Sequence, residues 1–346
     1  MKKLFAALLA GIMLVSLAAC GSSGQTQSSG EGSGNAGEAI TLKIAHGSAE
    51  THPLHRALLQ FKEDVEATGR FEVEIYPNQQ FGSDEEMLQS VKTGDLTMAV
   101  SPTSYLANDV PSMAMIELPY VFPNVATARA VLEGEWGTQE LEQLKDVNLY
   151  ALGYMESGMR QMTNSKHTIT SPADLSGLKL RTMNVEAHIR FFNSLGASAE
   201  GSPFSELYTN LSTGVFDGEE NPIAQIYANK FYEVQQYITI TDHIYTTYVP
   251  VMRLDFWEGL SADDQEILNT AFASAYTAGL EMLEADEAQQ LSEMEAAGCE
   301  VTTLTPEQKQ AFIEAAQPTL MEYRDSIGAD VYDAFAQAIK DCTVEG

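Results

Sequence analysis

The stretch SGLKLRTMNVEAHIRFFNSLG, residues 176–196, has the pattern of a short strand followed directly by a helix. Leu178 and Leu180 alternate with polar neighbours, which predicts a strand with one buried face. After Asn184, a residue type that caps helices, apolar side chains recur at helical spacing and stop at a glycine. The stretch therefore predicts an α/β unit with Arg181 at the carboxyl end of its strand.

Strand and helix patterns alternate on the amino-terminal side as well. Residues 41–46, 71–75 and 96–101 alternate like strands, and residues 54–65 and 87–91 carry apolar side chains at helical spacing between them. Such alternation is typical of parallel sheets with helices on both faces, so we expect an α/β fold.

The last third of the chain has a different pattern. Residues 261–298 contain no proline and many strong helix formers after Ser261, a residue type that caps helices. We expect one or two long helices here, long enough at about 1.5 Å per residue to brace two domains. Another helix is expected to begin at Thr305–Glu307.

Arg181 is placed where ligands bind in open α/β sheets, beyond the carboxyl ends of the strands. Its planar guanidinium stays charged and can hold a carboxylate through two hydrogen bonds, which predicts an anion clamp. The alternative is a structural ion pair with one of the 49 acidic residues.

The charge of the chain narrows the class of partner. It has 346 residues, 44% of them hydrophobic, with 19 basic and 49 acidic residues and a formal net charge of −30. A chain this acidic repels the nucleic-acid backbone, so we expect no nucleic-acid partner. It also repels small anions, so an anion site must create a local positive potential.

The amino terminus, MKKLFAALLAGIMLVSLAAC, has two lysines, an apolar core and small residues before Cys20, as in an export signal. Leu17–Cys20 resembles a bacterial lipobox, which implies a signal peptide over 1–19 and a lipid on Cys20. Residues 20–38 are rich in Gly, Ser and Gln and predict a flexible linker. We expect a protein anchored on the extracytoplasmic face of the cell membrane; the alternative is a soluble secreted protein.

Only Cys299 and Cys342 remain for the folded part. An oxidising compartment permits a disulfide, but sequence does not show that the two thiols are close. Both the paired and the free states stay open.

Residues 153–243 carry motifs in a fixed order and spacing. They include Phe204–Tyr208 (FSELY), Asp217–Gly218, Glu220–Pro222 (ENP) and Lys230–Val234 (KFYEV). With these motifs the chain, over roughly residues 40–330, closely resembles the solute-binding proteins of tripartite ATP-independent periplasmic (TRAP) transporters of the C4-dicarboxylate type.

The resemblance implies a two-domain, periplasmic-binding-protein-like (type II-like) α/β fold with crossing strands and a long bracing helix. A small organic carboxylate would bind in the cleft between the domains and pass to the TRAP membrane subunits, with no cofactor, metal or catalysis. We expect a monomer. The domains are expected to comprise 39–157 with 247–285, and 158–246 with 286–346.

The resemblance also implies roles for three residues. Arg181 matches the arginine that pairs with the ligand carboxylate, while Arg160 and Asn221 match residues that usually line the site. The alternatives are that Arg160 forms a surface ion pair and that Asn221 caps the helix beginning near Pro222.

Other positions are candidates by their place in the chain. Asn184 and Phe204 match positions that often contact the ligand, although each also suits a cap or core role. The first domain is expected to contribute a wall of polar side chains: His46, Asp84, Ser101 and Thr103.

The chain departs from the common family pattern near Arg181. Thr182–Met183 replaces a frequent Val-Pro pair, and residues 199–202 (AEGS) replace a more apolar run. A carboxylate near an anion site suits polyhydroxy acids, whose hydroxyls need acceptors, better than dicarboxylates. Asp84 or Glu200 would supply such an acceptor.

A secreted enzyme and a binding protein of an ATP-driven importer are the two alternative classes of function. The sequence contains no HExxH, GxSxG or GxxxxGK[ST] motif of a secreted enzyme or nucleotide-binding protein. His46, His52 and His55 could together bind a metal ion, but residues His52–His55 also have the pattern of a polar helix start. A binding protein of an ATP-driven importer is the other alternative, and the motif series between 204 and 222 favours the TRAP type.

Overall fold

The computed structural model describes residues 39–344. The expected signal peptide, the expected lipid-bearing Cys20 and the expected linker up to residue 38 lie outside the described residues. Within residues 39–344, no helix combines the length and the apolar character needed to cross a membrane.

The first strands and helices form where the sequence predicts them. β1 (Ile40–His46) lies between β2 (Phe71–Tyr76) and β3 (Met98–Pro102) and runs parallel to both. α1 (Pro53–Glu66) and α2 (Asp84–Thr93) connect these strands, and each buries one apolar face. The carboxyl ends of β1 and β3 therefore meet at one edge of the sheet.

A second parallel group is built around the strand that carries Arg181. β6 (Lys179–Thr182) lies between β7 (Ser198–Gly201) and β8 (Gly218–Pro222), parallel to both. α6 (Glu186–Ser194) follows β6 and buries two phenylalanines in the core beside it.

Two long strands join the groups. β5 (Met155–Asn164) pairs antiparallel with β10 (Tyr245–Arg253) through its first half and with β8 and β9 (Tyr237–Ile240) through its second half. β10 also pairs antiparallel with β3. The parallel pairing indicated by the alternation is found within each group, and the two long strands are crossing strands of the kind the resemblance implies. Their antiparallel direction is not given by the alternation, which does not fix which strands pair.

The turn into β5 is closely packed against the longest helix. A Cβ atom built on Gly153 would lie 2.5 Å from Cε1 of Phe272, so no larger residue fits there without displacing that ring.

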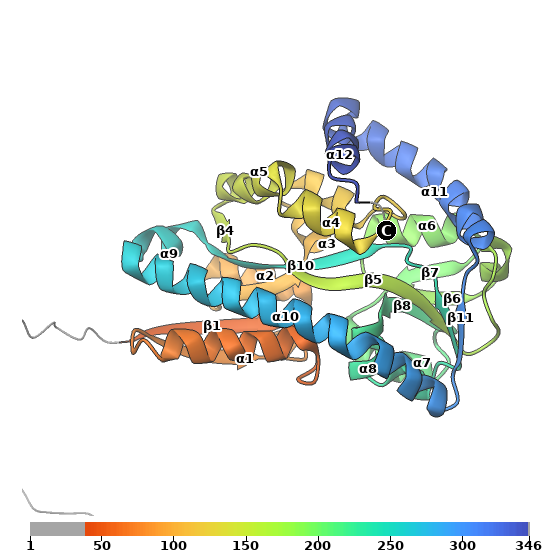
Figure 1. Cartoon of the computed structure of the whole chain (residues 1–346), viewed down its shortest axis with the longest axis horizontal. Coiled ribbons are helices and arrows are strands. Elements are labelled where there is room, and N and C mark those ends of the chain that lie inside the picture. Colours follow the sequence, from red (N-terminus) through yellow and green to blue (C-terminus); the bar gives the residue numbers. More distant parts are fainter. Residues whose placement is uncertain (1–38, 345–346) are drawn as a thin grey trace, which may run out of the picture. The chain divides into compact units, whose positions relative to one another are not determined.

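That helix, α10 (Ala262–Ala296), confirms the predicted long helix and spans 35 residues. Ser261 caps its start by accepting a hydrogen bond from the Asp264 backbone N–H. It packs against α1 through small residues, with Gly279 against Ala57, and contacts α8 (Ile223–Ala228) further along. Figure 1 shows it crossing both groups of strands.

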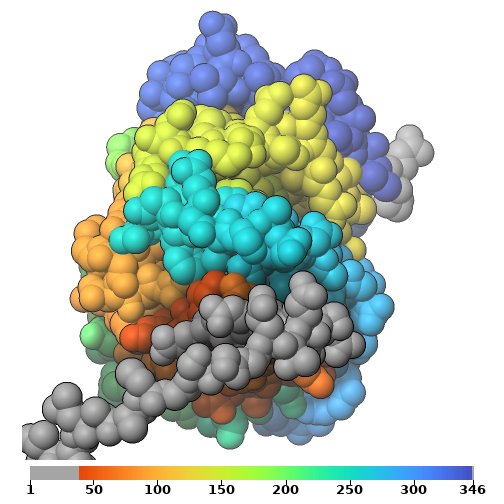
Figure 2. Space-filling model, turned by 90° about the vertical axis from the view of Figure 1, so that its left-hand side faces the viewer, coloured from red at the N-terminus to blue at the C-terminus, as the bar shows by residue number. Residues whose placement is uncertain are grey.

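Two helices follow at the carboxyl end. α11 (Pro306–Ile327) begins at the capping box of Thr305, as predicted, and α12 (Ala329–Asp341) follows it. Phe335 of α12 packs against Trp136, with ring centroids 4.4 Å apart. α12 thus lies on helices of the 39–157 segment, although the expected division assigns residues 286–346 to the second domain. Figure 2 shows these terminal helices in blue beside the yellow α4 and α5 region.

The remaining elements are short. The helices are α3 (Thr103–Leu106), α4 (Val125–Leu132), α5 (Glu135–Gln143), α7 (Leu207–Ser212) and α9 (Leu254–Gly259), the strands are β4 (Leu149–Ala151) and β11 (Glu300–Thr303), and the 3₁₀ helices are Pro111–Glu117, Leu144–Val147, Pro172–Leu175, Phe204–Glu206 and Phe231–Glu233.

The open question of the disulfide is answered by the packing. Cys299 and Cys342 are both free. The Cys299 thiol lies 3.4 Å from the backbone carbonyls of Tyr232 and Gln235, whereas Cys342 packs beside a different apolar cluster, the one that contains Phe335.

Candidate functional site

Arg181 is a buried cation without an acidic partner. Its side chain is 1% exposed, and Nε and Nη2 both donate to the backbone carbonyl of Ser202, at 3.1 and 2.6 Å. Nη1 is buried without a hydrogen-bond partner. Among residues 39–344 no carboxylate oxygen lies within 4 Å of this guanidinium, so it is not the structural ion pair that the sequence left as an alternative.

The surroundings of Arg181 hold it in one orientation. The Ser202 carbonyl fixes one edge of the guanidinium, and the Phe204 ring lies 5.7 Å from its central carbon. Burial lowers the pKa of Arg181, because a guanidinium removed from water loses its hydration. A buried arginine is almost always paired, so the free Nη1 marks a place for an anion.

Arg160, in contrast, is fully engaged. Nε donates to Glu220 Oε2 at 2.5 Å, Nη2 donates to Glu220 Oε1 at 3.0 Å and to Asn221 Oδ1 at 3.1 Å, and Nη1 donates to Thr246 at 3.3 Å. Although burial opposes both charges, this pair raises the pKa of Arg160 and lowers that of Glu220. The ion pair is buried, so the surface-pair alternative for Arg160 is wrong.

Asn221 continues this network away from the helix that follows. Its Oδ1 accepts from Arg160 and its Nδ2 donates to Glu219 at 2.5 Å. The N-cap of α8 is Pro222, so the interpretation of Asn221 as a helix cap is wrong. Burial raises the pKa of Glu219 to about 7, against the hydrogen bonds from Asn221 and Thr163.

A pocket lies between the two groups of strands, at the carboxyl ends of β1, β3, β6 and β8. The first group and its helices contribute mostly small and polar residues, β6 contributes Arg181, β5 contributes Arg160, and β10 contributes a hydroxyl-bearing pair. The lining residues are Gly47, Ser48, Asp84, Pro102, Tyr105, Arg160, Arg181, Met183, Phe204, Asn221, Gln225, Thr246 and Tyr248.

Five of the predicted site residues line this pocket: Arg181, Arg160, Asn221, Phe204 and Asp84. Asp84 is the first residue of α2, after the capping residue Ser83, and is buried. Its Oδ2 accepts from Gln79 Nε2 at 3.1 Å, and burial raises its pKa to about 6.

Asn184 lies beside the pocket. It lines an adjoining hollow with Glu85 and Pro203, and its amide donates to Glu85 Oε1 at 3.3 Å. The N-cap of α6 is Val185, so the prediction that Asn184 caps this helix was wrong; its side chain bonds across to α2 instead. Glu200, the alternative acceptor, is exposed and is not among the residues that line the pocket.

Three predicted residues lie behind the pocket wall. His46 is fully buried, 3.0 Å from His55 through their ring nitrogens, and its Nδ1 accepts from the Ser48 backbone N–H at 3.2 Å. Thr103 donates to Glu117 at 2.8 Å, and Ser101 is fully buried. None of the three is among the residues that line the pocket.

The third histidine of the suggested metal cluster has a different role. His52 accepts a hydrogen bond from the Leu54 backbone N–H and is the N-cap of α1. Its position confirms the interpretation of this segment as a polar helix start.

Sequence reasoning missed a hydrogen-bonded group of three residues that line the pocket. Gln225 Nε2 donates to Ser48 Oγ and to the Tyr248 hydroxyl, both at 2.7 Å. Ser48 follows β1, Gln225 lies in α8 and Tyr248 lies in β10, so no short motif connects them. The ENP motif, three residues before Gln225, was the one nearby signal.

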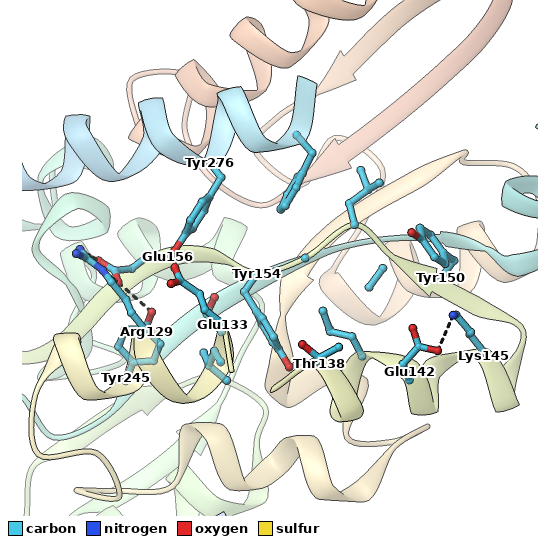
Figure 3. A pocket seen from close by; sticks show the side chains of 17 residues that line it. Arg129, Glu133, Thr138, Glu142, Lys145, Tyr150, Tyr154, Glu156, Tyr245 and Tyr276 are labelled. Carbon is cyan, nitrogen blue, oxygen red and sulfur yellow. Dashed lines mark hydrogen bonds and ion pairs between the residues drawn. The ribbon is translucent and has the colours of Figure 1, made fainter. Parts of the chain in front are cut away.

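A second cavity, of about 380 Å³, lies between α5, the β4–β5 turn and α10 (Figure 3). Its two cations are already paired: Arg129 holds Glu156 through bonds of 2.7 and 2.8 Å, and Lys145 holds Glu142 at 2.6 Å. The free cation for an anion therefore lies in the first pocket, at Arg181.

Residues 44–326 match the model of a family described as bacterial extracellular solute-binding protein, family 7. The chain is 31% identical over 296 residues to the C4-dicarboxylate-binding periplasmic protein DctP of Shewanella loihica, which covers 85% of this chain and 88% of that protein.

Solved structures show the same fold. The sugar acid binding protein DctPAm from Advenella mimigardefordensis, in complex with galactonate, aligns with a TM-score of 0.85 at 29% identity, over 88% of this chain and 99% of that one. A TRAP periplasmic solute-binding protein from Shewanella oneidensis with bound succinate aligns with a TM-score of 0.83 at 28% identity, over 87% and 100%. These likenesses confirm the predicted two-domain α/β fold.

Proposed function

Because this chain belongs to family 7 of the bacterial extracellular solute-binding proteins, we propose that it captures a small organic acid and delivers it to the membrane subunits of a TRAP transporter. The observation that carries the proposal is the buried guanidinium of Arg181, whose Nη1 has no partner. A carboxylate entering the pocket would complete its hydrogen bonds. We propose binding without catalysis, as for the relatives described as binding proteins.

The electrostatics of the pocket support this proposal. The protein carries a net charge of −30, yet Arg181 has no carboxylate within ion-pair distance among the described residues. An anion is held most strongly by a fixed donor in a water-poor pocket, because hydrogen bonds between charged groups are the strong ones. We propose that the protein acts as a monomer.

Binding is expected to raise the thermal stability of the protein. A ligand at a hundredfold excess over Kd that binds only the folded state adds about 2.7 kcal/mol to the free energy of unfolding. A thermal-shift screen of dicarboxylates, aldonates, uronates and keto acids should therefore give clear shifts with at least one class. Shifts with neutral sugars or peptides, and none with any acid, would contradict the proposal.

We also propose two bodies that close on the ligand, 39–157 with 247–285 and 158–246 with 286–346. The sheet supports this division, because β5 and β10 are the long strands shared by both groups. The packing of Phe335 on Trp136 indicates that the last helix bridges the two bodies.

The amino-terminal pattern supports a lipid anchor at Cys20, which we propose holds the protein on the extracytoplasmic face of the membrane. The full chain, expressed in a bacterium that processes lipoproteins, should fractionate with membranes, and Cys20→Ser should release it. Cys342→Ser is the matched control and should stay with the membranes. A Cys20→Ser protein that remained membrane-bound to the same extent would exclude the anchor.

A further inference from the structure

The pocket offers one free positive charge. Each nitrogen of Arg160 already has an acceptor within the protein, and Glu220 neutralises its charge. Arg181 keeps Nη1 free. One ligand carboxylate can therefore be matched by a cation, and a second one cannot.

The same pocket presents a negative charge that no cation pairs. Asp84 lines the pocket and accepts a hydrogen bond from Gln79 at 3.1 Å. Arg181 acts on Asp84 through space, yet no ion pair within 4 Å joins them. A second ligand carboxylate beside Asp84 would meet a like charge, whereas a hydrogen-bond donor would be held.

The pocket wall formed by Ser48, Gln225 and Tyr248 presents donors. The Tyr248 hydroxyl accepts from Gln225 at 2.7 Å, with the Ser157 and Ser48 hydroxyls at 3.4 and 3.5 Å. Because the Gln225 amide can only donate, the Tyr248 proton is directed to an acceptor, either a serine hydroxyl or a ligand oxygen. Gln225 also donates to Ser48. A ligand oxygen facing this group can accept from Tyr248 in place of a serine hydroxyl.

From this arrangement we infer that the ligand is a hydroxylated monocarboxylic acid of the aldonate type, with its carboxylate on Arg181 and its hydroxyls between Asp84 and the Tyr248–Ser48 wall. This inference rests on the proposed function. A hydroxyl both donates and accepts, so it satisfies Asp84 and Tyr248 together. A second carboxylate only accepts, and an ammonium group only donates, so neither satisfies both walls.

The test is a matched set of acids measured by titration calorimetry. At four carbons it comprises erythronate, tartrate, succinate and butanoate, which carry one or two carboxylates with or without hydroxyls; at six carbons it comprises galactonate, galactarate, adipate and hexanoate. In at least one set, the hydroxylated monocarboxylate should bind at least tenfold more tightly than each of the other three. 2-Aminobutanoate should bind no better than butanoate.

Two variants separate the walls. Asp84→Asn should lower the affinity for the hydroxylated monocarboxylate about ten- to a hundredfold. It should also reduce the difference in affinity between this acid and the dicarboxylates, because the amide removes the charge that repels a second carboxylate. Tyr248→Phe should lower the affinity for hydroxylated acids and leave the affinity for butanoate or hexanoate unchanged. Asp146→Asn, at an exposed position, is the control and should bind as the wild type does.

The results test the inferred ligand class separately from the proposed function. If succinate, adipate or an amino acid bound most tightly and Asp84→Asn left that ranking unchanged, the inference would be overturned while the proposed function stood. Binding by none of the acids, in a protein that melts cooperatively, would contradict the proposed function itself.

Discussion

Replacing Arg181 by alanine should lower the affinity for the organic acid by two to four orders of magnitude and leave the unliganded protein almost as stable as the wild type. The ligand carboxylate would then be buried without its partner, which costs on the order of 3 to 5 kcal/mol. Among residues 39–344 no carboxylate loses a partner, since the hydrogen bonds of Arg181 there go to the Ser202 carbonyl. The change in the free energy of unfolding should stay within about 1 kcal/mol.

Titration calorimetry and thermal melts on the same preparations measure both quantities. Arg181→Lys keeps the charge but loses the planar pair of donors, so its affinity should lie between those of alanine and wild type. Arg190→Ala, in an exposed pair with Glu186 of the same helix, is the control. An Arg181→Ala protein that melts much earlier and binds normally would show that Arg181 serves the fold instead.

Glu220→Gln should give the opposite pattern, a loss of about 3 to 5 kcal/mol in the free energy of unfolding of the unliganded protein. Glu220 accepts hydrogen bonds from Arg160, Thr182 and His243, and it is fully buried. The substitution leaves the Arg160 cation buried without a counter-charge, which is the costly half of a broken pair.

Denaturant unfolding measures this loss. Glu142→Gln is the matched control, because Glu142 pairs with Lys145 at a similar distance of 2.6 Å but is exposed; it should change stability by no more than about 0.5 kcal/mol. Arg160→Met combined with Glu220→Leu should recover part of the loss, since neither charge is then buried alone. A Glu220→Gln protein as stable as the control would mean that the buried pair contributes nothing to folding.

The fold was predictable where local signals decide it. Apolar periodicity placed β1, α1, β2 and α2 close to their observed bounds, and Ser261 with a proline-free run placed α10. The direction of β5 and β10 was not predictable, because strand pairing depends on residues about 90 positions apart. The docking of α12 depends likewise on the contact of Phe335 with Trp136.

The location of the site could be predicted from the sequence, but most of its side-chain contacts could not. The position of Arg181 after its strand indicated a ligand contact, but the engagement of Arg160 by Glu220 joins residues 60 positions apart. His46 ends β1 at the edge of the sheet where the pocket lies, yet its ring is hydrogen-bonded to His55. Gln225 and Tyr248 meet Ser48 from segments without any shared motif, so only the folded chain brings them together.

The contact between Gly153 and Phe272 restricts the evolutionary paths open to this protein. A Cβ atom at position 153 would lie 2.5 Å from the Phe272 ring, so any substitution there is harmful while the phenylalanine is present. A smaller residue at position 272 would remove the clash, but the backbone at position 153 has a φ of +155°, which L side chains rarely adopt. Two positions more than a hundred residues apart, together with the backbone itself, therefore hold glycine in place, and a lineage that keeps Phe272 has no single-step route away from glycine at the entry to its crossing strand.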